Sequence, residues 1–117
     1  MKGFTTAMLV AAALLSTPCL AARSTLIDRT WAPVSENHAE LEHDGRHYVL
    51  DTYIVMFQQP YYIHVRAKDG KPLDAAALVG MASDYITPRG CTEPLQRRSD
   101  LDRSSGDGTD VVLGFQC

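Results

Sequence analysis

The amino-acid sequence predicts an α+β domain, a small two-layer sandwich whose mainly antiparallel sheet carries one helix on one face. Three observations support this prediction: extended stretches before residue 68, one stretch with helical spacing over 73–86, and an alternating final stretch over 109–117. The predicted order is therefore β-β-β-α-β. Because a sheet face and a helix stripe each need apolar cover, the two elements are expected to pack on each other.

A hairpin is predicted around Asp44-Gly45, which separates the extended stretches 39–43 and 47–57. Both central residues of a tight type I′ turn have positive φ, and Asp-Gly is a favoured pair there. The stretch 47–57 is rich in β-branched and aromatic residues and is apolar on both faces near its end. This composition predicts a long strand in the interior of the sheet.

The stretch 61–67 alternates, with apolar residues on one face and Tyr62, His64 and Arg66 on the other. If the helix covers the apolar face, the second row faces solvent, with Tyr53 beside it on a neighbouring strand. Aromatic and arginine side chains on an open sheet are typical of protein-binding surfaces. The alternative is an ordinary strand exterior, where tyrosine and arginine are also common.

The helix is expected to begin near Pro72, with Asp74 placed favourably at the positive end of the helix dipole. Thr87-Pro88 is expected to end it, because a residue that precedes proline is disfavoured in the α conformation. The polar connection 89–108 is predicted to hold no regular element. At that length it would be either functional or mobile.

The N-terminus has the three parts of a secretion signal: Lys2, an apolar run over 8–15, and small residues before Ala22. Residues 1–21 are therefore predicted to be removed on export to the periplasm or the medium. The apolar run is about half the ~20 residues that span a bilayer, so no membrane span is expected in the mature chain. Residues 22–37 are predicted to be irregular, with Trp31 folded onto the domain formed by 38–117.

Removal of the signal takes Cys19 with it and leaves Cys91 and Cys117. An even number of cysteines in an oxidising compartment favours a disulfide, which would fasten the helix end to the last strand. The alternatives are an intermolecular bridge, a metal pair or free thiols.

The formal charge is −3, from 11 Lys+Arg and 14 Asp+Glu. Such a chain has no general electrostatic attraction to nucleic acid, which is therefore not expected as a partner. Neither a Gly-x-Ser-x-Gly motif nor a glycine-rich phosphate loop is present. The sequence thus favours a non-enzymatic domain without a cofactor.

Two charged clusters are further candidates. Three histidines with acidic neighbours could hold zinc or copper, and these are His38, His43 and His47. The alternative is that they belong to a solvated turn and bind no metal. Three arginines could form a binding site for an anion, and these are Arg89, Arg97 and Arg98. Acidic residues are interleaved with them, so the alternative is local ion pairing.

The function predicted from these patterns is an exported protein-binding accessory or inhibitor module. Its partner would be another envelope or extracellular protein. The main alternative is a metal-binding envelope protein that uses the histidine-rich hairpin. An enzyme acting through the connection 89–108 is a third class.

Overall fold

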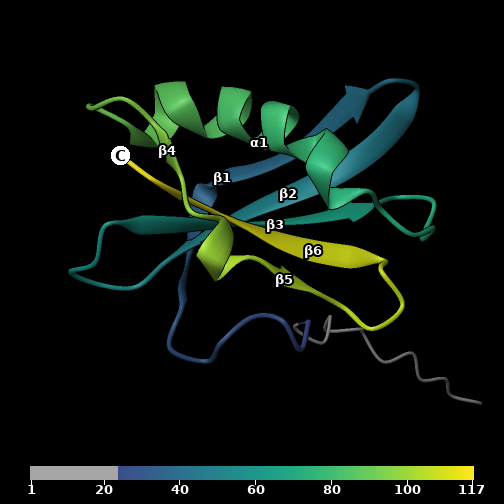
Figure 1. The fold of residues 1–117 in the computed structure, drawn as a ribbon, viewed down its shortest axis with the longest axis horizontal. Coiled ribbons are helices and arrows are strands. Elements are labelled where there is room, and N and C mark those ends of the chain that lie inside the picture. Colours follow the sequence, from purple (N-terminus) through teal and green to yellow (C-terminus); the bar gives the residue numbers. More distant parts are fainter. Residues whose placement is uncertain (1–23) are drawn as a thin grey trace, which may run out of the picture.

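A computed structural model describes residues 24–117 as an antiparallel sheet of six strands with one helix, which confirms the predicted α+β class (Figure 1). The predicted signal 1–21 and Cys19 lie outside the described residues. The long strands and the helix are β1 (Ala32–His43), β2 (Arg46–Ile54), β3 (Pro60–Ala67), α1 (Ala75–Gly90) and β6 (Asp110–Gln116). The sheet order is β1-β2-β3-β6-β4, so the last long strand lies inside the sheet.

The predicted first hairpin is present. Asp44 and Gly45 have φ values of 51° and 83°, as a turn with two left-handed residues requires. β1, however, begins at Ala32 and so includes part of the segment expected to be irregular. Its first residues pair with the far end of β2, and an irregularity between Val34 and Ala39 absorbs the residues that do not fit the ladder.

The helix begins two residues later than expected, because Asp74 is its N-cap and accepts a hydrogen bond from the Ala76 amide. The prediction that Thr87-Pro88 ends it is wrong, since the helix continues to Gly90. Tertiary contacts hold this last turn: the Tyr61 hydroxyl donates to the Gly90 carbonyl at 2.6 Å. A local preference set by proline is thus overridden by packing.

The connection 89–108 is not structureless, contrary to expectation. It contains β4 (Gln96–Arg97), a short 3₁₀ helix η1 (Ser99–Leu101) and β5 (Arg103–Ser104). Both short strands pair with β6 and cover the edge of β6 that faces away from β3. The segment can pack this closely because Gly114 has no side chain: a Cβ there would lie 2.6 Å from the Arg98 carbonyl oxygen.

The main core lies between α1 and one face of the sheet. Alternate residues of β2, β3 and β6 point toward the helix and are almost fully buried. Its largest fully buried members are Phe115, Leu50, Ile63, Ile86 and Leu113. This core contains the strand face and the helix face that the alternation and the helical spacing predict.

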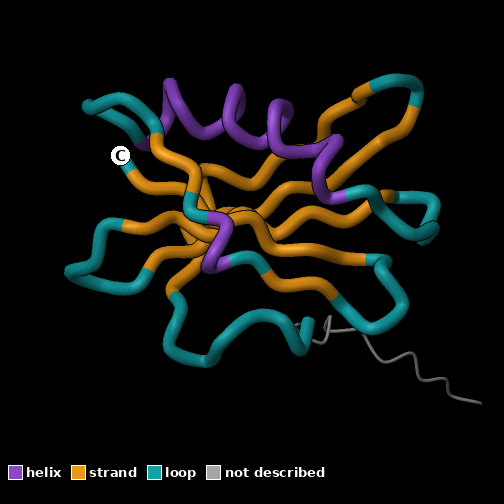
Figure 2. The backbone as a smooth tube through the Cα atoms, viewed as in Figure 1, coloured by secondary structure: helices purple, strands orange, loops and turns teal. Residues whose placement is uncertain are grey.

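Part of the opposite face of the sheet is covered by residues 24–31, here called the strap (Figure 2). The strap contributes Ile27 and Trp31 to a second, smaller apolar cluster with Tyr62 and Val112. Trp31 is buried, as predicted for a lone tryptophan. Within residues 24–117, no helix is long and apolar enough to cross a membrane.

Candidate functional site

The row of side chains expected to face solvent is largely covered. Tyr62 and His64 are buried, so the prediction of an open face is wrong for both. Trp31 stacks on Tyr62 with 3.9 Å between ring centroids and lies 6.3 Å from the partly buried Tyr53. Of the four predicted residues, Arg66 alone remains exposed. The apolar character of this row serves an intramolecular contact with the strap.

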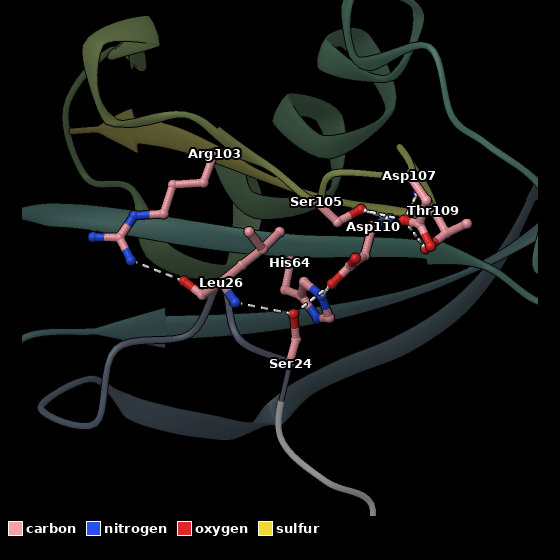
Figure 3. Close-up of polar contacts among 8 residues, drawn as sticks. All are labelled: Ser24, Leu26, His64, Arg103, Ser105, Asp107, Thr109 and Asp110. Atoms are coloured by element: carbon pink, nitrogen blue, oxygen red, sulfur yellow. Dashed lines mark hydrogen bonds and ion pairs between the residues drawn. The ribbon is translucent and has the colours of Figure 1, made fainter.

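Arg103 of β5 makes two contacts with the strap. Its guanidinium lies 4.4 Å from the Trp31 ring and donates a hydrogen bond of 2.9 Å to the Leu26 carbonyl (Figure 3). A cation over an indole face and a charge-assisted hydrogen bond each stabilise the contact modestly. The strap is therefore held by one arginine and a small apolar cluster.

A partly buried polar cluster forms the second anchor of the strap (Figure 3). Oδ2 of Asp110 accepts a hydrogen bond from the Ser24 hydroxyl and lies 2.9 Å from His64 Nε2. Burial alone would raise the pKa of Asp110. Hydrogen bonds from Ser24, His64 and Ser105 together outweigh that effect and lower the pKa below its ordinary value.

Serine, histidine and aspartate meet here, but their order differs from that of a catalytic triad. In a triad the imidazole lies between the hydroxyl and the carboxylate, so that it can take the hydroxyl proton. Here Ser24 and His64 both contact the same oxygen of Asp110, Oδ2. The Ser24 hydroxyl donates its hydrogen bond to the carboxylate of Asp110, so the cluster joins the strap to β6.

The three predicted metal-binding histidines do not converge. His43 lines a hollow beside α1, whereas His38 lines one on the opposite face of the sheet and contacts Asp51 through Nδ1. His47 is exposed and pairs in register with Glu42. Within residues 24–117, no group of three or more His, Cys, Asp or Glu side chains is placed to share a metal ion. The alternation of the strand separates residues that are neighbours in sequence.

The three arginines of the predicted anion site are engaged in local contacts. Arg97 and Arg98 form ion pairs with Asp102 and Asp100, respectively. The Asp100 carboxylate, beside Arg98, has a pKa below its ordinary value. Arg89 lies over the Tyr85 ring and donates to the Tyr85 carbonyl. This arrangement matches the ion-pairing alternative.

Cys91 and Cys117 lie at disulfide-bonding distance, with 5.3 Å between their Cα atoms. Cys91 is the C-cap of α1, and its amide donates to the Thr87 carbonyl. The bridge therefore joins the helix end to the residue after β6, at the place the sequence indicates. A crosslink there restrains the unfolded chain and stabilises the last turn of the helix.

One exposed feature was not anticipated. β2 ends at Ile54, so Met56 and Phe57 lie in the loop to β3 and not in the predicted strand. Phe57 is 100% exposed and Met56 is 59% exposed, the large hydrophobic side chains that stand out from the described surface. Phe57 also has a φ of +68°, a left-handed conformation that is unusual for a bulky residue.

The base of this loop is well fixed. The Val55 carbonyl accepts a hydrogen bond from the Gln58 amide across the turn. Gln59 accepts a side-chain hydrogen bond from Gln116, the residue next to the disulfide. The loop, here called the hairpin tip (55–59), therefore presents its aromatic residue from a braced end of the sheet. The sequence signal for this loop is Gln58-Gln59-Pro60, which interrupts the apolar run just before β3 begins at Pro60.

The comparisons with known proteins add no functional identity to this geometry. No protein-family model, curated protein sequence or solved structure matches the chain.

Proposed function

We propose that this chain is a small exported, non-enzymatic module that binds another envelope or extracellular protein, and that the hairpin tip enters the partner. The observation that carries the proposal is Phe57, fully exposed and held in a left-handed backbone conformation. It acts as an accessory subunit or as an inhibitor. Both roles use the same contact, an aromatic anchor that fills an apolar pocket.

Phe57 contributes nothing to the fold that would explain its presence. A left-handed conformation costs an L-residue about 1–2 kcal/mol relative to glycine-like freedom. The ring is 100% exposed, so it gains no burial within the chain. Two local costs at one residue, on an otherwise regular hairpin, favour a role outside the folding of this chain.

The braced base of the tip also favours binding. A loop that is already ordered loses less conformational entropy when it docks than a flexible one does. The tip is held by the Gln59–Gln116 hydrogen bond, next to Cys117. Export is supported by the predicted signal and by the paired cysteines, because disulfides persist mainly in oxidising compartments.

The test is site-specific photo-crosslinking in the native envelope. A benzophenone side chain at Phe57 is expected to give an adduct with one partner, and excess native protein should compete it away. The matched control is Asp44, which is also exposed and also has positive φ, at the tip of the other hairpin. Adducts of equal yield from both positions, or none from Phe57, would contradict the proposal.

A second variant separates binding from stability. Phe57→Gly is expected to leave stability unchanged or raise it by up to about 1 kcal/mol, because glycine accepts positive φ without strain. The same variant should fail to compete for the adduct, whereas Asp44→Gly should compete as well as native protein. A Phe57→Gly protein that competes normally would exclude the tip as the binding element.

A further inference from the structure

An unpaired strand edge with a groove beside it lies at the opposite end of β2 from the hairpin tip. β1 lies at one side of the sheet, close to α1 (Figure 1). Residues of β1 and α1 line the groove between them. Among the described strands, β1 is the terminal one on its side, since its single partner is β2. A strand edge of this kind carries backbone groups that can pair with an added strand.

The direction of those backbone groups follows from the ladder. The His47 carbonyl accepts a hydrogen bond from Lys68, so the backbone of His47 points toward β3. Its partner Glu42 is therefore in a non-hydrogen-bonded pair, and the Glu42 amide and carbonyl point away from β2. Because this pattern repeats every second residue, Glu40 points outward as well. Two consecutive outward-facing positions offer four backbone groups to a neighbouring strand.

The groove beside this edge has a volume of about 440 Å³. Leu41 of β1 and Met81 and Tyr85 of α1 supply much of its apolar lining, and the polar side chains that also line it are His43, Asp84 and Arg89. Gly80 lies on the same exposed helix surface, and a Cβ there would meet no atom within 4 Å. The groove can therefore admit a side chain that points toward α1 from a strand added to β1.

The charge of β1 restricts which kind of strand can pair with its open edge. The strand carries Glu36, Glu40 and Glu42 and no lysine or arginine. Glu40 is paired with Lys68, whereas no ion pair to Glu42 is found within residues 24–117. A second copy of β1 placed antiparallel would bring glutamates together, which is unfavourable. An added strand that carries basic residues on the same face as Glu40 and Glu42 is complementary in charge to β1.

We propose that this edge binds an extended segment of a partner protein by strand addition, in which apolar residues alternate with lysine or arginine. The backbone of the segment pairs with Glu40 and Glu42. One apolar side chain enters the groove over Leu41, Met81 and Tyr85, and the basic side chains lie on the other face near Glu42. Backbone pairing supplies affinity and the groove supplies selectivity, as in other strand-addition modes.

The experiment uses the mature protein and a capped peptide of four Lys-Val repeats. Titration followed by ¹⁵N NMR should show saturable binding, with amide exchange slowed at Glu40 and Glu42. A peptide of four Lys-Ser repeats should bind at least tenfold more weakly, because serine gains little in the groove. Equal binding of the two peptides would show a purely electrostatic contact and overturn the proposal.

Gly80→Leu tests the groove without disturbing the core, because residue 80 is exposed and leucine has the better helix propensity. It should reduce Lys-Val binding at least tenfold, while Ala76→Leu, an exposed helix position outside the groove lining, should leave binding unchanged. Glu42→Lys should shift preference toward a Glu-Val peptide. Failure of these effects, or a dimer in sedimentation that Gly80→Leu abolishes, would overturn the proposal. Loss of the Phe57 adduct would leave this result unaffected.

Discussion

The two faces of the sheet are covered in different ways. On one face α1 packs along the sheet and forms a continuous apolar core that includes Phe115, Leu50 and Ile63. On the other face the strap buries a smaller cluster centred on Trp31 and Tyr62. The strap is then fastened by polar contacts from Arg103 and Asp110. The cover of the first face is stabilised by a large buried apolar area, and the cover of the second face by a small apolar cluster and a few polar contacts.

This difference implies two levels of stability in one small domain. Elements that bury much apolar surface open only with global unfolding, whereas elements with few buried contacts can open locally. We therefore expect the strap to detach at a lower free energy than the one that separates α1 from the sheet. The four predictions below test this ordering.

The largest effect is expected from Phe115→Ala, on the helix-covered face of β6. Removing a fully buried aromatic side chain costs about 3–5 kcal/mol, from lost transfer energy and the cavity left behind. Urea unfolding followed by far-UV circular dichroism measures it. Val112→Ala, on the strap-covered face of the same strand, should cost about 1–2 kcal/mol. Equal losses would remove the distinction between the faces.

The next effect is that of the disulfide, which reinforces the helix-covered side. Replacing Cys91 and Cys117 together by serine should lower the free energy of unfolding by about 3.5 kcal/mol, from the chain-entropy relation for a loop of this size. Denaturant unfolding gives the value. Reduction of the native protein should reproduce it. A change under about 1 kcal/mol would show that the bridge adds little to the helix–sheet contact.

A smaller global effect is expected from Trp31→Ala. We expect a loss of about 1–2 kcal/mol, less than for a core aromatic residue, because the loss is limited by what strap closure contributes. Hydrogen exchange should accelerate at strap amides, while the amides of α1 and of the central strand β3 keep their protection. Uniform acceleration across the chain would mean that strap and core unfold as one unit.

The smallest effect is an acid dependence confined to the strap. The pKa of Asp110 is lowered in the folded chain, so its carboxylate contributes stability that is present above the unfolded value of about 3.9. That contribution is lost as pH falls through the lower folded pKa. Trp31 is the single tryptophan of the chain, so its emission should move to the red below about pH 4. Helix ellipticity should be retained over the same range.

The matched control is Asp110→Asn, which keeps the shape of the side chain and removes its titration. Trp31 emission in that variant should be insensitive to acid over the same range. If the native and variant proteins give the same acid transition, the Asp110 cluster does not control strap closure.

Much of the sheet and the helix could be predicted, because periodicity reports which face a residue presents. Tyr61 and Ile63 point to the core as the alternation over 61–67 indicates. Asp44-Gly45 forms the expected turn. The cysteine pairing was predictable because loss of Cys19 with the predicted signal leaves only Cys91 and Cys117. Each of these signals is local or depends on very few candidates.

The candidate site was less predictable, because it depends on contacts between distant segments. Tyr62 and His64 were expected to be exposed, but the strap lies over them through contacts with Trp31 and Ser24. Alternation along a strand says which residues share a face and not what covers that face. The exposure of Phe57 likewise depends on where β2 ends, which backbone pairing with β3 decides.

Strand order also bears on how the chain folds. The β1–β2 and β2–β3 pairings are local hairpins, whereas β6 joins β3 only after the chain has passed through α1 and the short strands. Pairing over such a separation is expected to be the slow step, because closing a long loop precedes any gain in contacts. Until it is complete, β3 exposes an apolar strand edge on which other chains could associate. The rate of β6 docking therefore sets how long each new molecule is vulnerable to aggregation.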